Sequence, residues 1–298
     1  MKFKDWCYKY LYDYKSITLK QSTFDSYLHY IKHITTDCEL EDITLEELQA
    51  VITAMHNKGL KYSTIKHTLT IMRQALNKAY MLHRVNKILP FNLLEVPPAV
   101  KEPVQALTED EVRKLLNGKS CIHKDLFLFL LFTGCRVGEA IALKWNDIDM
   151  RNGFIYLRHT DYHGTLQSAK NKRSRVIPIT RNVKEILQRH LSFNKNDRVF
   201  LNKNKKPCTY SAIRSYWTVY ATKLQLRPCG LHTLRHTFAT LAIRAGANIK
   251  AVSQILGHSD VNITLNIYTD ISPAQKRIAL NTFENALDYS PEQLRIAL

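Results

Sequence analysis

The sequence predicts a mainly α-helical protein of the α+β class, in which a helical N-terminal domain precedes a second helical domain with a small antiparallel three-stranded β-sheet. Apolar residues recur at helical spacing over most of the 298 residues. The exception is residues 154–179, where short β-rich runs alternate with turn residues. A proline-containing stretch separates the two helical parts and indicates a domain boundary.

The N-terminal helices are predicted from apolar periodicity and from residues that favour helix starts. Residues 3–14 carry apolar side chains at the i, i+3, i+4 positions of an amphipathic helix. Ser22 and Thr44 each stand three positions before an acidic residue, the pattern of a capping box. A fourth helix is predicted to begin near Ser63. The pattern therefore predicts an all-helical domain over residues 1–88.

The second domain is predicted to span residues 106–298, after a linker at 89–105 that holds four prolines. Its first helix is predicted to begin at Thr108, which stands three positions before a glutamate. The apolar run within residues 124–132 predicts a buried helix. A separately capped tail helix is predicted at the end of the chain, beginning at Ser290.

Three short runs predict the strands of the sheet. They are FIYLRHT at residues 154–160, GTLQS at 164–168 and SRVIPI at 174–179, and turn residues separate them. We expect the three runs to pair in one antiparallel sheet. Lys170 would then lie in the turn between the last two strands.

The charge balance points to a polyanionic partner. Lysine and arginine outnumber aspartate and glutamate by 43 to 26, which gives a formal net charge of +17 and a pI near 9.6. A basic surface of this size usually binds nucleic acid. No apolar run reaches transmembrane length and the N-terminus has no apolar signal core, so a cytoplasmic protein without a membrane partner is expected.

The sequence predicts no cofactor and no metal site. Six cysteines are scattered without a C-x-x-C pair, so neither a zinc ribbon nor a disulfide framework is indicated. No H-E-x-x-H pattern and no glycine-rich phosphate loop appears. Neither a divalent metal ion nor ATP is therefore expected.

Four side chains suited to handling a phosphodiester lie near the C-terminus: His232, Arg235, His258 and Tyr268. A helix is predicted from Thr233 onwards, which places His232 and Arg235, three positions apart, on neighbouring positions of one face. A second predicted helix ends just before His258, at a glycine that stops helices by tolerating positive φ. Taken singly, each of these residues is more often surface or packing than function.

The order of these residues resembles the tyrosine recombinase (phage integrase) family. H-x-x-R is followed by L-G-H and then by a tyrosine ten residues on. Two further positions of the family are matched upstream, by Arg136 in TGCRVGEAIALKW and by Lys170 in SAKNKRSRVIPI. The helices LEDITLEELQAVITAM and GLKYSTIKHTLTIMRQALNKA also look like the family's core-binding domain.

The resemblance implies a site-specific DNA recombinase with a SAM-like core-binding domain and a catalytic domain that together clamp duplex DNA. It implies a homotetramer on two DNA sites, an accessory DNA-bending or directionality protein, and no cofactor. It also implies catalysis by six residues: Arg136, Lys170, His232, Arg235, His258 and Tyr268.

These residue types suit cleavage of DNA through a 3′-phosphotyrosyl intermediate. Tyr268 would attack the phosphorus as the nucleophile. Arg136 and Arg235 offer planar forks of donors to the non-bridging oxygens, and Lys170 would protonate the leaving 5′ oxygen.

The remaining residues are given supporting roles. His258 and His232 would add donors to the phosphate, and His232 is also a candidate base for the tyrosine. Glu139, one helical turn after Arg136, is expected to orient that arginine or Lys170. Asp270 departs from the family, which often has a histidine there, and no arm-binding domain is expected before the helical domain.

Several functions fit the same residues. Integration and excision of a mobile element such as a phage is preferred. Xer-like resolution of chromosome dimers and DNA inversion use the same chemistry, and a type IB topoisomerase uses the same attack without strand exchange. A catalytically inert DNA-binding regulator on the same scaffold is the alternative from another class.

Overall fold

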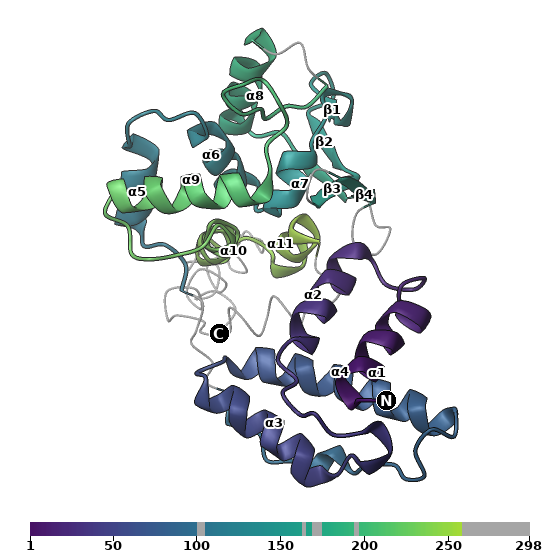
Figure 1. The fold of residues 1–298 in the computed structure, drawn as a ribbon. Coiled ribbons are helices and arrows are strands. Elements are labelled where there is room, and N and C mark those ends of the chain that lie inside the picture. The colour runs from purple at the N-terminus through teal and green to yellow at the C-terminus, as the bar shows by residue number, and fades with distance from the viewer. Residues whose placement is uncertain (100–104, 163–164, 169–174, 194–196, 258–298) are drawn as a thin grey trace, which may run out of the picture. The chain divides into compact units, whose positions relative to one another are not determined.

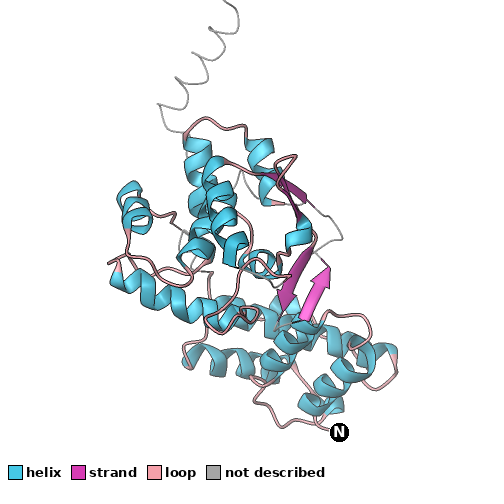
Figure 2. Ribbon diagram, turned by 90° about the horizontal axis from the view of Figure 1, so that it is seen from above, coloured by secondary structure: helices cyan, strands magenta, loops and turns pink. Residues whose placement is uncertain are grey.

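The computed structural model describes residues 1–99, 105–162, 165–168, 175–193 and 197–257 (Figure 1). The chain divides into two compact units, Met1–Pro103 and Val104–Leu298. Helices dominate both units, and the strands are few and short (Figure 2). The mainly α prediction is thereby confirmed. Within the described ranges, no helix is both long enough and apolar enough to span a membrane.

In its described residues, the first unit is built from helices, with one isolated β-bridge between Lys2 and Glu39. Its longer helices, with a π-helical turn after the first, are α1 (Phe3–Tyr10), η1 (Leu11–Lys15), α2 (Gln21–Ile31), α3 (Leu45–Asn57) and α4 (Tyr62–Met81). Short 3-10 turns at Leu40–Asp42 and Phe91–Leu93 complete it. The apolar faces of these helices meet in one core around Trp6, whose indole donates to the Ala75 carbonyl at 2.8 Å.

Part of the proline-containing stretch belongs to the first unit. Leu94 is buried in the core of that unit, and Leu89, Phe91 and Val96 pack against it. Gln49 of α3 also exchanges two hydrogen bonds with the backbone of Glu95, at 2.9 and 3.1 Å. This part of the stretch is therefore packed structure rather than a free connection.

The second unit surrounds a buried helix with amphipathic ones. Its helices are α5 (Glu109–Asn117), α6 (Lys124–Thr133), α7 (Val137–Ala142), η4 (Trp145–Asp147), α8 (Arg181–Phe193), α9 (Tyr210–Lys223), α10 (His232–Arg244) and α11 (Ile249–Leu256). Every residue of α6 from Leu126 to Leu131 is buried, because α8 and α10 pack against it. The apolar run therefore forms the centre of the unit.

A three-stranded antiparallel sheet is present, as predicted, but its strands differ from those expected. Its order is β1–β2–β5, formed by Ile148–Asp149, Phe154–Leu157 and Arg175–Pro178. The segment GTLQS supplies β4 (Thr165–Ser168), which pairs instead with β3 (His159–Tyr162) in a separate two-stranded hairpin.

The predicted strand 154–160 is therefore wrong as a single element, since it breaks at Arg158. That side chain forms an ion pair with the buried carboxylate of Asp147 at 3.5 Å. Beyond the break, β3 packs on α7, where a Cβ added at Gly138 would lie 2.7 Å from the Thr160 hydroxyl. Lys170, expected within a turn of one sheet, lies in sequence between the hairpin and β5 and outside the described residues.

Helix starts follow the predicted caps in most places. Thr44 and Thr108 both accept a bond from the backbone three residues on, and Thr108 forms the complete capping box with Glu111. The predicted start at Ser22 is wrong, because α2 begins at Gln21, whose side chain donates to Asp25 at 2.8 Å inside the first turn. The predicted tail helix lies outside the described residues.

Candidate active site

Arg235 is buried where α10 meets the ends of two other helices. It is 4% exposed. Its Nη1 donates to the Gly134 carbonyl at 2.9 Å, and its Nη2 donates to the Leu256 carbonyl at 2.7 Å. Burial, followed by the charges of Arg136 and Arg175, lowers the pKa of Arg235 to about 10. The guanidinium therefore stays protonated at neutral pH and joins the end of α6 to the end of α11.

Gly134 permits the close approach of these two helix ends. It terminates α6 with a φ of 62°, a left-handed conformation that glycine adopts without steric cost. A Cβ at this position would lie 2.4 Å from the Phe238 ring of α10 and 2.9 Å from Leu256. The turn that carries Arg136 is consequently pressed against α10 and α11.

Gly134→Ala is expected to destabilise the protein more than Gly153→Ala. Gly153 also has a positive φ, of 75°, but has no atom within 4 Å of an added Cβ, so it reports the backbone strain alone. The crowding at Gly134 should add about 1–3 kcal/mol to the loss in unfolding free energy. Urea unfolding of both variants measures the difference. Equal losses of unfolding free energy would show that the Phe238 ring moves aside at little cost.

Glu139 holds Arg136 from one turn further along α7. Its carboxylate is 5% exposed and accepts from the Arg136 backbone N–H at 2.7 Å and from Nη1 at 3.1 Å. The Arg136 side chain keeps 38% of its surface exposed. One carboxylate thus fixes both the backbone and the side chain of this arginine, while part of the side chain remains accessible.

Arg175 is a member of the cluster that sequence reasoning missed. It begins β5 and donates to both oxygens of Glu139, from Nη1 at 2.7 Å and from Nη2 at 2.6 Å. Burial acts to raise the pKa of Glu139, but the hydrogen bonds and charge of Arg175, with smaller contributions from Arg136, bring that pKa below its ordinary value. Arg175 was missed because the sequence shows only an arginine at the start of a predicted strand, and this does not identify the carboxylate to which it binds.

His232 and His236 lie on α10 with Arg235. His232 begins the helix and is exposed, and its ring meets that of His236 edge-on with centroids 4.7 Å apart. Burial, followed by the charge of Arg235, lowers the pKa of His236. The uncharged form of His236 is therefore favoured, one helical turn after the exposed His232.

The structure brings Arg136, Glu139, Arg175 and Arg235 together in what we call the arginine cluster. Glu139 accepts hydrogen bonds from Arg136 and Arg175, and Arg235 bonds to backbone carbonyls beside them, with His232 on the same helix. Three predicted site residues lie outside the described part of the chain: Lys170, His258 and Tyr268. Lys170 lies in sequence between the end of β4 at Ser168 and the start of β5 at Arg175. Gly257, which follows the last residue of α11 and has a φ of 67°, directly precedes His258 in the sequence.

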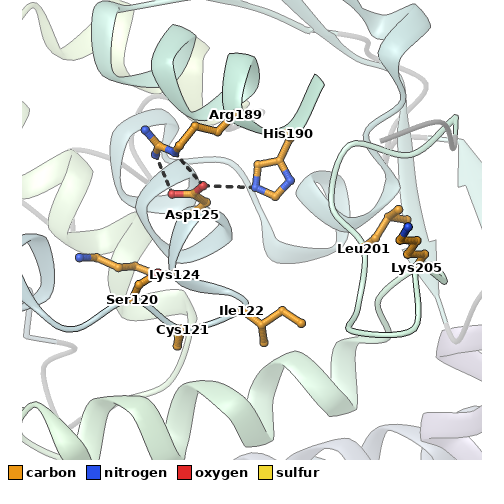
Figure 3. Close-up of a pocket in the computed structure, with 9 residues that line it drawn as sticks. All are labelled: Ser120, Cys121, Ile122, Lys124, Asp125, Arg189, His190, Leu201 and Lys205. Carbon is orange, nitrogen blue, oxygen red and sulfur yellow. Dashed lines mark hydrogen bonds and ion pairs between the residues drawn. The ribbon is translucent and has the colours of Figure 1, made fainter. Parts of the chain in front are cut away.

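A separate pocket lies elsewhere in the second unit (Figure 3). It measures about 370 Å³ and is lined by Ser120, Cys121, Ile122, Lys124, Asp125, Arg189, His190, Leu201 and Lys205. Arg189 donates to both oxygens of Asp125, at 2.7 and 3.1 Å, and His190 lies 3.4 Å from the same carboxylate. None of the site residues in the described part of the chain lines this pocket, so it is distinct from the arginine cluster.

Asp125 is expected to contribute to stability above its ordinary pKa of 3.8. Burial acts to raise its pKa, but the bonds from His190 and Arg189 hold it well below that value. Because the folded-state pKa is depressed, the stabilisation is complete above the unfolded pKa and declines as the pH falls towards the folded one. Urea midpoints at pH 7 and at about pH 3 should differ less in Asp125→Asn than in wild type; an unchanged difference would assign the acid loss to other groups.

The sequence prediction of no metal site overlooked one pair of carboxylates at D-x-D spacing, Asp147 and Asp149, but both side chains are engaged in local contacts. Asp147 accepts from the Lys144 backbone at 3.3 Å and pairs with Arg158, and Asp149 accepts from the Asn152 backbone at 2.8 Å. Over the described ranges, no three histidine, cysteine, aspartate or glutamate side chains are grouped so that they could hold a metal ion.

Comparison with known proteins identifies a family from the sequence. The model of the phage integrase family matches residues 105–275. Tyrosine recombinase XerD of Halalkalibacterium halodurans is 27% identical over 281 residues, which cover 87% of this chain and 90% of XerD. Tyrosine recombinase XerA of Pyrococcus horikoshii is 29% identical over 193 residues, covering 63% of this chain and 64% of XerA.

Two solved structures share the fold. The transposon Tn1549 integrase in complex with a circular intermediate DNA has a TM-score of 0.82 at 23% identity, with 95% of this chain and 99% of that chain covered. A lambda integrase dimer bound to a COC′ core site has a TM-score of 0.76 at 21% identity, with 92% and 97% covered. Since the family model matches more than half of the sequence, the chain belongs to the phage integrase family, the tyrosine recombinases.

Proposed function

We propose that this recombinase cleaves and rejoins DNA at specific sites, with Arg136 and Arg235 binding the scissile phosphate and Tyr268 attacking it. The single observation that carries the proposal is that both guanidinium groups are held in place. Two backbone carbonyls hold Arg235 and Glu139 holds Arg136, so neither has to reorganise when negative charge develops. Among the described residues, these bonds use only part of the fork of each arginine, which leaves further N–H donors for phosphate oxygens.

In the proposed reaction Tyr268 loses its proton to a base, for which His232 is the candidate, and its oxygen bonds to phosphorus. The bond from phosphorus to the 5′ oxygen breaks with its electron pair on that oxygen, which takes a proton from Lys170. The 3′-phosphotyrosyl bond retains the energy of the broken bond. Attack by the 5′ hydroxyl of a second strand reverses the step and exchanges strands, without a metal ion or ATP.

His258 is proposed as a further donor to the phosphate, and Glu139 as the group that orients Arg136. The exposed position of His232 at the start of α10 is consistent with a contact to substrate.

Duplex DNA is the proposed partner of both units. The net charge of +17 supports binding along the phosphate backbone, with the helical domain at residues 1–88 and the catalytic domain at 106–298 on the same duplex. Lambda integrase has been solved as a tetramer bound to a Holliday junction, and we propose a homotetramer on two sites here as well. A DNA-bending or directionality protein is a proposed accessory partner, and the cytoplasm is the proposed compartment.

Integration and excision of a mobile element is the proposed biological role. The integrase of transposon Tn1549 aligns with 95% of this chain, which supports a mobile-element integrase. XerD of Halalkalibacterium halodurans and XerA of Pyrococcus horikoshii are named as tyrosine recombinases of the Xer type, which supports resolution of chromosome dimers as the second candidate. Both candidates use one chemistry, so they differ in the DNA sites and not in the cluster.

A nicked-duplex assay tests the chemistry. A recognition sequence is first selected from random DNA by binding to the full chain, and duplexes nicked next to the cleavage position are then incubated with the protein in EDTA. We expect a covalent protein–DNA complex, with the nucleotide attached to the peptide that contains Tyr268. Specific binding without a covalent complex would favour the inert regulator, and relaxation of supercoiled DNA without strand exchange would favour the topoisomerase.

A further inference from the structure

Arg175 donates hydrogen bonds to protein groups from all three nitrogens of its guanidinium. Its Nη1 and Nη2 bind the two oxygens of Glu139, and its Nε donates to the Ile255 carbonyl at 2.7 Å. The side chain is 12% exposed, against 38% for Arg136. A planar fork that meets a carboxylate with two parallel bonds has a fixed orientation as well as a strong bond. Arg175 is thus directed at the protein, whereas Arg136 retains accessible surface.

The two partners of Arg175 are the groups next to the proposed phosphate-binding arginines. Glu139 also accepts from the backbone and the side chain of Arg136. Ile255 directly precedes Leu256, whose carbonyl accepts from Arg235. Arg175 is therefore connected to Arg136 through the Glu139 carboxylate, and to Arg235 through the backbone at Ile255 and Leu256.

The end of α11 packs directly on the Arg175 side chain. A Cβ at Gly257 would lie 2.9 Å from both Cδ and Nη1 of Arg175. Gly257 is in the left-handed region, with a φ of 67°, and it directly precedes His258 in the sequence. The turn that leads towards His258 is thus set by a contact as well as by the Ile255 bond.

Charge explains why an arginine suits this position. Glu139 is 5% exposed, and a buried carboxylate without a cation would tend to take up a proton. A protonated Glu139 would lose its charge-assisted bond to Arg136. Arg175 adds two charge-assisted bonds from β5 to the one that Arg136 supplies, and these favour the ionised form of Glu139.

We propose that Arg175 is a positioning residue, which holds Arg136 through Glu139 and Arg235 through the Ile255–Gly257 turn, so that both arginines meet one phosphate at a fixed separation. The proposal rests on the proposed function of the cluster. It adds to the six family positions a seventh residue that does not itself contact DNA.

The first test uses the full chain without DNA and needs no activity. Arg175→Lys and Arg175→Met are compared with Arg189→Met, which removes a similar two-bond arginine pair, to Asp125, away from the cluster. Arginine-selective ¹⁵N NMR follows the Nε–H signals of Arg136 and Arg235. Both signals should shift and exchange faster with water in the Arg175 variants, and stay in place in Arg189→Met. Unchanged signals in the Arg175 variants would overturn the proposal.

The second test separates positioning from general damage. Cleavage is measured at saturating DNA on a nicked duplex and on the same duplex with a methylphosphonate at the scissile position, which lacks one charged oxygen. We expect Arg175→Lys to slow phosphate cleavage about 100-fold, because displaced reacting groups cost roughly that factor. The methylphosphonate reaction should slow far less, since little charge is left for the arginines to bind.

An equal loss on both substrates, or a loss equal to that of Arg189→Met, would overturn the proposal, because a destabilised fold would act on both reactions alike. If the wild type cleaves neither substrate, the proposed function fails. In that case the NMR comparison still decides whether Arg175 positions the two arginines.

Discussion

Tyr268→Phe is expected to abolish the covalent protein–DNA complex while leaving DNA affinity unchanged. Phenylalanine keeps the ring but removes the only atom that can bond to phosphorus, so no residual nucleophile remains at that position. Affinity should persist because it depends mainly on lysine and arginine contacts to phosphates. Denaturing gels of nicked-duplex reactions measure the complex, and native gels at a stated salt concentration measure binding.

Tyr216→Phe is the matched control for this loss. Tyr216 is an exposed tyrosine of α9, and its ring packs edge-on against His123, away from the arginine cluster. Removing its hydroxyl should leave the covalent complex at the wild-type level. A complex that persists in Tyr268→Phe would show that another residue is the nucleophile, and the tyrosine assignment would fail even if recombination continued.

Much of the fold was predictable from local signals in the sequence. Thr44 and Thr108 were recognisable as caps because a hydroxyl three residues before an acidic side chain satisfies free N–H groups within a few residues. The glycine that ends α11 was recognisable for a similar reason, since its positive φ is a property of one residue. Such features need no knowledge of distant parts of the chain.

The pairing of the strands was not predictable from the sequence, because it depends on contacts between separated segments. The runs at 154–160, 164–168 and 174–179 have the alternation of strands, but alternation does not name a partner. The hairpin β3–β4 forms because β3 packs on α7 at Gly138 and the chain breaks at Arg158 to meet Asp147. Both contacts join segments that are separated in the sequence, and so the strands were predicted while their grouping was not.

In the arginine cluster, too, the local contact was predictable and the long-range contact was not. Glu139 lies one helical turn from Arg136, so a contact between them was predictable from spacing. Arg175 reaches Glu139 from 36 residues away, and the sequence around it reads as an ordinary strand. The roles proposed for Lys170, His258 and Tyr268 stay predictions from the family pattern.

Arg235→Lys is expected to slow cleavage about 1,000-fold, at the lower end of the effect of removing an arginine that binds a transferring phosphoryl group. Lysine keeps the positive charge, but a single ammonium group is not a planar fork. It cannot bind the Gly134 and Leu256 carbonyls in the same geometry and also meet a phosphate. Single-turnover cleavage at saturating DNA measures this loss without a contribution from weaker binding.

The same substitution should also lower the free energy of unfolding by about 1–3 kcal/mol, because a buried carbonyl is left without its donor. Arg198→Lys separates the two effects. Arg198 is a buried arginine of the same unit that donates to the Ile141 carbonyl at 3.1 Å, and it is not among the proposed catalytic residues. We expect a comparable loss of stability from Arg198→Lys, but cleavage within a few-fold of wild type under conditions where both variants are folded.

If both variants lost cleavage equally, the effect of Arg235 would be structural, and the fixed pair of arginines would no longer account for phosphate binding. If only Arg235→Lys lost cleavage, its two backbone bonds would be the means by which the fold holds a charged group ready at the site, since burying that charge is otherwise unfavourable.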